Sequence, residues 1–555
     1  MEVFPILVDG EEVDTGKYTV FPDMEKVTQD PGLGIALQML NASSLSRFVF
    51  SKVPGLIPSS TPEMRFLKDY RRYHGVPKYS KDEIDNVVYT KVSLSREEDI
   101  ERAITAGTRD HKKLYNPFRI PGMGVTLDER ADALHNASLE IKKNWDAIRE
   151  ISIKEGMPVG TLKWAWNLGA WSDYRKSVDE WGKLLDVIEE PGLDGGRSYR
   201  FREPYGVSAL FTPYNAPIAL GIFSITSSIL AGNSTILKPP NKVPLSTIIF
   251  ARIFMKSFLE SGMPSSILQI LTGGGKEMME RFVSDSRVGA VVWYGDSDVG
   301  LKLWSDAVGR RTQMAPELAG SDPCLVWGKD VDLRKAAEVI TKGRFLGSGQ
   351  ACMAIKRLIV QDSLYSDLVS LLVEEAKKLK VGLPSDPTVS LSPVGITALY
   401  LLIDQMKDAV AKGAKIETGG YRVNYLDEPD PAGLFYKPTI VTNVSLDMRL
   451  MTEEVFAPAL PVYPVKSVDE AIAVANQSRF GLRSSVITDD IEIRQRWIKE
   501  IETAGVGTGD DHLYYDPYMP HLGGYKDSGI IGGKYFTTML SRMKYVHAGP
   551  ETGFL

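Results

Sequence analysis

An α/β fold with two layers of parallel strands and a small β extension is predicted by the order of apolar segments along the chain. Short apolar runs at residues 207–211, 235–237, 268–271 and 290–293 are separated by helical stretches. This alternation is typical of a parallel, doubly wound sheet, because a parallel strand needs a crossover helix to return the chain to the same edge. The first layer is therefore expected to end near Glu317.

The same alternation resumes on the far side of Glu317 and predicts a second α/β layer. Helical stretches again separate short apolar runs, and no internal repeat is apparent. The predicted strands lie at residues 324–326, 357–360 and 460–464, and the predicted helices near residues 331–346, 364–378, 396–412 and 468–476.

The first part of the chain predicts a hairpin followed by helices. Residues 3–22 contain short strand-forming runs, with a turn at residues 8–11. Residues 127–153 carry amphipathic helical patterns, and a further helix at residues 161–185 gathers five aromatic side chains. These aromatics are compatible with core packing and with a substrate entrance, since aromatic side chains supply apolar contact in both settings. They are Trp164, Trp166, Trp171, Tyr174 and Trp181.

Length and composition are those of a large globular protein. The chain has 555 residues, too many for one hydrophobic core, and its 43% apolar and 25% charged residues are ordinary values. The net charge of -6 and the pI of about 5.8 leave no basic surface that would favour nucleic acid as a partner.

Cysteine usage and hydropathy predict a cytoplasmic protein without a membrane span. Cys324 and Cys352 are the only cysteines, so no disulfide framework is expected, and the first residues lack the pattern of a signal peptide. The longest weakly polar run, residues 216–232, is interrupted by hydroxyl side chains and is shorter than the roughly 20 residues of a membrane span. It is therefore expected to form a buried helix.

Cys352 is the residue around which the functional prediction is built. It follows Gly347 and Gly349, which allow the backbone to come close to a reacting centre, and it precedes the apolar run 358–360. A thiol in such a loop is either a small buried hydrophobe or a nucleophile. Five further motifs, in fixed order along the chain, favour the nucleophile. They lie at residues 211–217, 236–240 and 316–320 upstream, and at residues 453–458 and 523–529 downstream.

These six motifs together closely resemble those of the aldehyde dehydrogenase superfamily. The resemblance runs from about residue 88 to residue 546, with a further short match at residues 6–10. It implies a non-acylating, NAD(P)-dependent enzyme with a Rossmann-like parallel-sheet cofactor domain, a second α/β catalytic domain and a small β oligomerisation arm. The expected boundaries are an N-terminal hairpin at 1–26, the NAD(P)-binding domain at 86–185 and 205–318, the catalytic domain at 319–504, and the arm with the C-terminal tail at 186–204 and 505–555.

The resemblance also bears on assembly and on the N-terminal region. Residues 27–85 have no counterpart in the resembled family, so an ordered insertion is expected, either with a structural or subunit-contact role or as an active-site lid. Residues 505–509 and 541–547 are expected to add strands to a partner's sheet, which would give a homodimer or homotetramer.

The resemblance assigns chemical roles to three residues. Cys352 matches the nucleophile, and Asn215 matches the residue that forms an oxyanion hole with the backbone N–H of the cysteine, a task that suits a neutral amide donor. Glu317 matches the general base, and a carboxylate beside apolar groups has a raised pKa that suits this task near neutral pH. Two departures, Ala319 for a usual glycine and Gly347 for a usual asparagine, concern loop conformation more than chemistry.

The expected cofactor is NAD or NADP. Lys238 matches the lysine that hydrogen-bonds the adenosine ribose, Glu454 the glutamate that holds the nicotinamide ribose, and Phe456 the ring packed beside it. Where many NAD-preferring relatives carry a glutamate, this chain has Asn241, which has no charge to repel the 2′-phosphate of NADP. Lys242 would favour that phosphate if its side chain turned inward. Both cofactors are therefore expected to support turnover.

A glycine turn after residues 291–293 is a second candidate for cofactor contact. Gly295, Asp296 and Gly300 lead into a predicted helix whose first N–H groups could meet a phosphate, although the pattern is not GxGxxG. Because an acid would repel a pyrophosphate, either Asp296 points away or the phosphate lies further off. No metal site is expected.

The positions expected to line a substrate tunnel are apolar or aromatic. Within four residues on either side of Cys352 the only arginine or lysine is Lys356. An aromatic or medium-chain aldehyde is therefore expected, since apolar pockets select apolar bodies. The tunnel positions are Tyr214, Phe223, Met353, Tyr514 and Tyr515.

Three alternative functions remain open. A cysteine hydrolase needs a histidine partner, and the chain has no histidine between His135 and Cys352. A non-catalytic relative would be expected to lose the nucleophile or the base, and both are present. An enzyme that passes the acyl group to coenzyme A typically lacks the glutamate that matches Glu317, because water must be kept from the thioester.

Overall fold

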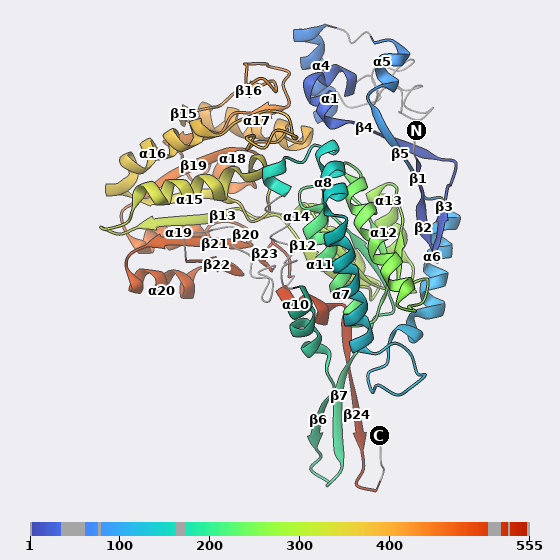
Figure 1. Cartoon of the computed structure of the whole chain (residues 1–555). Coiled ribbons are helices and arrows are strands. Elements are labelled where there is room, and N and C mark those ends of the chain that lie inside the picture. Colours follow the sequence, from blue (N-terminus) through green and yellow to red (C-terminus); the bar gives the residue numbers. More distant parts are fainter. Residues whose placement is uncertain are drawn as a thin grey trace.

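Two α/β lobes stand side by side, and a narrow β arm projects from one of them (Figure 1). The computed structural model describes residues 3–34, 61–75, 79–162, 174–508, 523–530 and 533–551. Each lobe is built on a seven-stranded sheet. The α/β class predicted from the sequence is confirmed.

The first sheet has the strand order β12-β11-β8-β9-β10-β2-β3, and its first five strands are parallel. β8 and β9 are buried along their whole length, as expected for strands that helices cover on both faces. The parallel strands are β8 (Val207–Phe211), β9 (Ser234–Lys238), β10 (Leu268–Ile270), β11 (Val288–Tyr294) and β12 (Gln313–Glu317).

Helices cover this first sheet on both faces and form two separate apolar cores. Every residue of α11 is buried, so the weakly polar run after residue 216 is a core helix as predicted. Among the described helices none is long and apolar enough to cross a membrane. One core contains α7 (Leu127–Lys143), α11 (Pro217–Ala231) and α12 (Pro244–Glu260), and the other contains α6 (Glu97–Asp110), α13 (Gly275–Ser284) and α14 (Ser297–Gly309).

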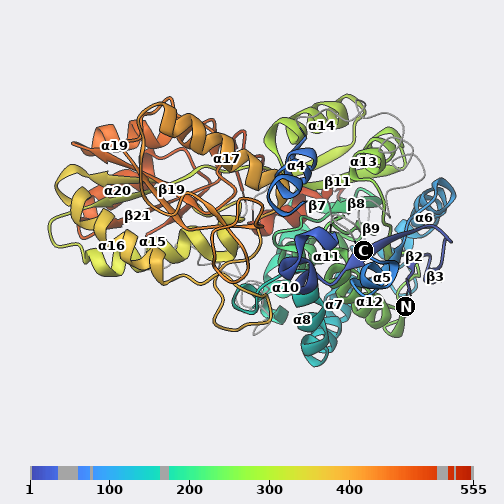
Figure 2. The same cartoon turned by 90° about the horizontal axis from the view of Figure 1, so that it is seen from above.

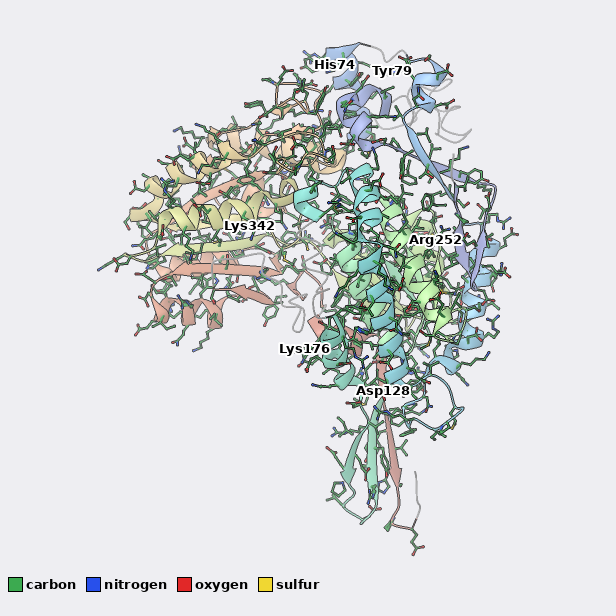
Figure 3. The ribbon with its side chains drawn as sticks, viewed as in Figure 1. His74, Tyr79, Asp128, Lys176, Arg252 and Lys342 are labelled. Carbon is green, nitrogen blue, oxygen red and sulfur yellow. The ribbon has the colours of Figure 1, made fainter. Side chains whose placement is uncertain are left out.

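The predicted N-terminal hairpin is present, but it is not a separate unit. β2 (Ile6–Val8) and β3 (Glu11–Val13) extend the first sheet, because β2 pairs antiparallel with the edge strand β10. Arg252 of α12 faces the hairpin (Figure 3), donates to Pro5 O at 3.3 Å and lies 3.0 Å from Glu12. The hairpin thus covers an edge that would otherwise expose unpaired backbone groups.

The second sheet has the strand order β15-β18-β19-β14-β13-β21-β22. All neighbouring pairs are parallel except β15 with β18. Its strands are β13 (Asp322–Trp327), β14 (Ile355–Gln361), β15 (Lys415–Thr418), β18 (Thr439–Thr442), β19 (Ala459–Val465), β21 (Arg483–Thr488) and β22 (Gly505–Gly507). Its helices are α15 (Leu333–Phe345), α16 (Tyr365–Lys378), α17 (Ile396–Ala411), α19 (Val468–Asn476) and α20 (Ile491–Glu500).

The placement of β22 corrects the prediction that residues 505–509 belong to the arm. β22 pairs in parallel with β21 and so forms the outer edge of the second sheet. The arm itself contains β6 (Ile188–Pro191), β7 (Arg197–Pro204) and β24 (Ser541–Ala548), all antiparallel. β24 pairs with β7 of its own chain over its full length, which leaves only its outer edge open to a partner.

The segment between residue 523 and β24 is also not part of the arm. β23 (Tyr525–Lys526) pairs with β20 (Phe480–Gly481), and the Ser528 hydroxyl donates to Ala319 O at 2.6 Å. Phe536 is fully buried and stacks on Phe223 at 5.1 Å between ring centroids. Apolar burial and these hydrogen bonds hold the segment between the two lobes.

The described parts of the predicted insertion lie at the top of the molecule, where α4 (Pro62–His74) packs against α17 of the second lobe (Figures 1 and 2). α1 (Met24–Gln29) packs against α8 (Trp145–Lys154) of the first lobe. At the end of α4, His74 contacts Asp430 at 3.0 Å (Figure 3). The segment therefore touches both lobes.

Candidate active site

Cys352 lies in a tight loop between α15 and β14, and its side chain is half-buried. Gly347, Ser348 and Gly349 before it all have positive φ angles, of 58°, 59° and 70°. A Cβ at Gly349 would lie 3.1 Å from two backbone carbonyl oxygens, so only glycine fits there. Ser348 is held in this costly conformation by its hydroxyl, which donates to Ser392 O at 2.6 Å.

Glu317 is the last residue of β12, is only 3% exposed and meets Cys352. A hydrogen-bonding interaction with the thiol lowers the pKa of the carboxyl group, and Glu317 Oε1 has no partner among the residues that the structure describes. Burial raises the pKa of Glu317 to about 7, and burial together with the Glu317 charge raises the pKa of Cys352 well above its usual value. The carboxyl group therefore lies beside the thiol and can act as a base near neutral pH.

Lys356 is a charged group at the site to which sequence reasoning gave no role. Its side chain is fully buried, and its ammonium donates to Cys352 O and, at 2.8 Å, to Glu454 Oε1. The same Glu454 oxygen accepts the Gly320 N–H at 3.0 Å. The spacing of four residues from Cys352 is visible in the sequence, but the contact with Glu454 arises only from the fold.

Lys238 and Asn241 lie together after the carboxyl end of β9, the edge at which open parallel sheets bind nucleotides. The buried Lys238 ammonium donates to Asn241 Oδ1, and burial lowers the pKa of Lys238 to about 8. A Cβ on Gly275 would lie 3.8 Å from this ammonium, so the glycine leaves space beside it. An ammonium and a side-chain amide can both form hydrogen bonds with hydroxyl groups, so the pair is chemically compatible with a ribose diol.

Asp296 is the N-cap of α14, and its carboxylate accepts the Val299 N–H at 3.0 Å. It does not point away from the helix end, so a phosphate would have to lie further off. Gly295 donates its N–H to Glu317 O at 3.1 Å and so ties this turn to the end of β12. A Cβ on Gly300 would lie 2.2 Å from the Leu318 side chain, which explains the glycine.

A cavity of about 620 Å³ is lined by both Cys352 and Asn215. The Asn215 amide makes no hydrogen bond within the described part of the chain, so its donors are available. Tyr214, Phe223 and Met353 also line the cavity. Phe456 does not line it but lies 6.3 Å from Tyr214, centroid to centroid.

The predicted aromatic positions are only partly described. Tyr174 and Trp181 line the cavity and are also buried. Core packing and a place beside the substrate cavity, the two predictions for the aromatic helix, therefore both apply to these two residues. The remaining members lie outside the described residues. They are Trp164, Trp166, Trp171, Tyr514 and Tyr515.

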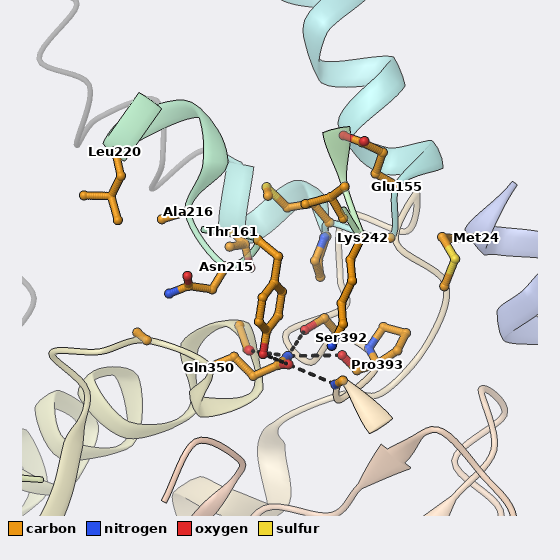
Figure 4. A pocket seen from close by; sticks show the side chains of 18 of the residues that line it. Met24, Glu155, Thr161, Asn215, Ala216, Leu220, Lys242, Gln350, Ser392 and Pro393 are labelled. Carbon is orange, nitrogen blue, oxygen red and sulfur yellow. Dashed lines mark hydrogen bonds between the residues drawn. The ribbon is translucent and has the colours of Figure 1, made fainter. Parts of the chain in front are cut away.

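Sequence reasoning missed the polar side of this cavity, which Figure 4 shows. Lys242 extends from the loop between β9 and α12 along the ring of Tyr214, toward Gln350 and the loop at Ser392 and Pro393. It lines the same cavity as Cys352 and its sequence neighbour Asn241. Its neighbours from the insertion could not be recognised from the sequence, because no local pattern tells which wall a long connection covers. They include Val27, Glu63 and Phe66, and Met24 just before the insertion also lines the cavity.

Comparisons with known proteins find relatives over most of the chain. The model of the aldehyde dehydrogenase family matches residues 78–546. The chain is 30% identical to the 3-sulfolactaldehyde dehydrogenase of Priestia aryabhattai, over 79% of this chain and 87% of the relative. It is 35% identical to a succinate-semialdehyde dehydrogenase (NADP+) of Mycobacterium avium, over 62% and 71% of the two chains.

A solved structure shares the fold. The glyceraldehyde-3-phosphate dehydrogenase of Methanocaldococcus jannaschii, crystallised with NADP, superimposes with a TM-score of 0.74 at 28% identity and covers 83% of this chain and 96% of its own. The resemblance inferred from the six motifs is thus confirmed. The chain belongs to the aldehyde dehydrogenase family, whose members are oxidoreductases that act on aldehyde groups with NAD or NADP.

Proposed function

We propose that this protein oxidises an aldehyde to the free carboxylic acid with NAD(P)+, through a covalent thiohemiacetal and a thioester on Cys352. The proposal rests on the interaction between the Cys352 thiol and the buried Glu317 carboxyl group. Cys352 also lines a cavity together with Asn215. A nucleophile in contact with a base is the arrangement that covalent catalysis requires.

In the first half of the reaction Cys352 loses its proton to solvent, and the thiolate sulfur attacks the aldehyde carbon. The carbonyl oxygen becomes an oxyanion, which the Asn215 amide and the Cys352 backbone N–H stabilise as hydrogen-bond donors. A neutral amide suits this place because it donates without competing for the thiol proton.

Lys238 and Asn241 would hold the adenosine ribose of the cofactor, while Glu454 and Phe456 would hold the nicotinamide end. For that, Glu454 must exchange its present contacts with Lys356 and Gly320. When bound, the cofactor would supply a nicotinamide ring as hydride acceptor for oxidation of the thiohemiacetal to the thioester.

In the second half Glu317 takes a proton from water, and the resulting hydroxide attacks the thioester carbonyl. The C–S bond breaks, the acid leaves, and Glu317 passes its proton to the departing Cys352 sulfur, which restores both the thiol and the carboxylate. The presence of Glu317 favours this hydrolysis over transfer to coenzyme A. The alternatives of an acylating enzyme and of a non-catalytic relative remain for experiment.

The lining of the cavity supports a substrate with an apolar body, of aromatic or medium-chain type, because Phe223, Trp181 and Leu220 form much of its wall. The three relatives named above carry names that denote aldehydes bearing an acid group. An apolar body and an acid group are compatible in one molecule.

Single-turnover kinetics test the assignment of nucleophile and base. Cys352→Ala is expected to abolish turnover, whereas Glu317→Gln is expected to keep a burst of reduced cofactor and to slow the steady state by about 10²–10⁴-fold. Cys324→Ala is the matched control, since Cys324 is buried in β13 away from the cavity. Equal loss of burst and steady state in Glu317→Gln would argue against its role as base.

Cofactor choice is expected to be weakly discriminating. Asn241 has no charge to repel a 2′-phosphate, so both NAD and NADP should support turnover, with NADP at least comparable. Asn241→Glu should move the ratio of kcat/KM values toward NAD by about 10–100-fold, because one repulsive charge contact is restored. An enzyme that ignores NADP at saturating concentration would contradict this charge argument.

A further inference from the structure

Lys242 brings a cationic group into the cavity that contains Cys352. Its loop is fixed after Lys238 by two prolines, and its far end is anchored where the Glu155 carboxylate accepts the N–H groups of Leu245 and Ser246. The ammonium lies 4.9 Å from the centroid of the Tyr214 ring (Figure 4). The face of an aromatic ring orients a nearby cation but does not neutralise its charge.

The polar groups around this ammonium are satisfied by one another. Gln350 accepts the Gly395 N–H at 3.0 Å and the Tyr214 hydroxyl at 3.4 Å, and it donates to Pro393 O at 3.1 Å. A Cβ on Gly395 would lie 3.7 Å from the Lys242 ammonium, so the glycine leaves that space open. Among the described residues near this ammonium, Lys242 is therefore a donor that still has hydrogen-bonding capacity.

No acid neutralises Lys242 by direct contact within the described residues. Two acids line the cavity, and both carboxylate oxygens of Glu155 are already used by backbone N–H groups. Glu63 at the start of α4 acts on Lys242 only through its charge. The Lys242 side chain is exposed in the cavity, and desolvation by the surrounding protein lowers its pKa.

We propose that Lys242 binds an acid group on the substrate, so that the protein acts on aldehydes that carry a carboxylate or a sulfonate remote from the carbonyl. A cation in a largely apolar cavity gains most when a singly charged anion pairs with it. The apolar wall supplied by residues such as Phe66 and Leu220 then accommodates the spacer between the acid group and the aldehyde. The inference rests on the proposed function, because the reacting aldehyde at Cys352 defines the other end of the substrate.

Paired substrates test this inference. A series of ω-oxo carboxylic acids and ω-oxo sulfonic acids of increasing length is compared with unbranched aldehydes of the same lengths. In Lys242→Met, kcat/KM should fall about 10–100-fold on the acidic aldehydes, mainly through KM, and stay within about twofold on the neutral ones. Lys242→Arg should keep most of the preference for acids.

The matched control is Lys256→Met, which removes an exposed lysine from α12, the helix that follows the same loop. It should change neither series. Thermal unfolding of each variant checks that the fold is intact. The carboxylate and sulfonate arms show which acid group the cavity prefers.

Direct binding separates this inference from the proposed function. Dicarboxylic acids, which correspond to the expected products, are titrated calorimetrically into Cys352→Ala protein. Adding Lys242→Met should weaken binding by a factor similar to that seen in kcat/KM. Adding Glu63→Gln should instead strengthen binding about threefold, because it removes a negative charge that acts on the same site.

Each outcome discriminates. If Lys242→Met lowered kcat/KM equally for acidic and neutral aldehydes, Lys242 would serve only to shape the cavity, and the inference would be overturned. If Lys242→Met lowered kcat/KM with NADP but not with NAD, whatever the aldehyde, Lys242 would be assigned to the cofactor phosphate, and the inference would also be overturned. Lys242-dependent binding of diacids without turnover of any aldehyde would defeat the proposed function alone, and turnover without that dependence would defeat the inference alone.

Discussion

At the scale of single residues, the buried Glu317 carboxyl makes hydrolysis of the thioester sensitive to pH. Burial raises the pKa of Glu317 to about 7, so the group is protonated below that pH and cannot accept a proton from water. The steady-state rate is therefore expected to rise as pH increases through about 7 and to level off above it. A pH profile of kcat measures this.

The same pH step should be missing in Glu317→Gln, whose remaining rate has no carboxyl group at this position. A wild-type profile that stays flat from pH 5.5 to pH 8.5, with hydrolysis rate-limiting, would contradict the assignment. These limits bracket the pKa by roughly 1.5 units on each side, which covers most of a single titration.

Lys356 is expected to favour the thiolate form of Cys352. Its buried ammonium contacts Cys352 O and lowers the pKa of the thiol against the opposing effects of burial and Glu317. Lys356→Met should therefore slow alkylation of Cys352 by iodoacetamide at pH 8 by about tenfold, the effect of one pKa unit. Mass spectrometry of the modified peptide measures the rate.

The other cysteine does not disturb this measurement, because Cys324 is buried and burial raises its pKa to about 12. Lys256→Met serves again as the control for loss of an unrelated lysine. Alkylation of Lys356→Met at the wild-type rate would show that the ammonium acts only on backbone conformation.

At the scale of elements, α4 joins the predicted insertion to the second lobe. Arg65 of α4 binds Asp404 of α17 through two hydrogen bonds of 2.6 and 2.8 Å, and Asp69 contacts both Tyr400 and Arg422. Because Glu63 and Phe66 of the same helix line the cavity, these contacts hold one of its walls. This placement supports an active-site role in addition to a structural one.

Asp404→Ala is expected to loosen α4 locally. Amide hydrogen exchange in residues 62–74 should increase, while the free energy of unfolding falls by less than about 1 kcal/mol, because the Arg65–Asp404 pair is partly exposed and screened by solvent. Arg72→Ala, on the exposed side of α4, is the control. Unchanged exchange in Asp404→Ala would show that the apolar contacts of Phe66 alone hold the helix.

At the scale of the whole molecule, the C-terminal strand is expected to support assembly into a homodimer or homotetramer. β24 pairs with β7 along its full length, and Arg202 donates to the Ser541 hydroxyl and carbonyl oxygens at 2.7 Å. Deleting residues 541–555 would expose the edge of β7, so monomeric or aggregated protein is expected. Light scattering after size-exclusion chromatography measures the mass.

Deleting only residues 549–555 is the control, because β24 ends at Ala548 and stays intact. This shorter variant should keep the wild-type mass. A fully active monomer after the longer deletion would show that the arm is not needed for assembly or for activity.

The sequence by itself determined the features that depend on local patterns. The alternation of strands and helices, the helix after residue 216 and the glycine-rich loop before Cys352 could all be predicted, because burial periodicity and backbone preference act over a few residues. The order of the six motifs was enough to identify the family.

Only the tertiary structure decided which distant side chains meet. The sequence left open whether the Lys242 side chain turns inward, and the fold places it in the cavity that Asn241 and Cys352 also line. Lys356 has Glu454 as its partner, and β22 belongs to the second sheet rather than the arm. Side-chain direction and sheet membership depend on packing between segments far apart in the chain, and no local pattern encodes such contacts.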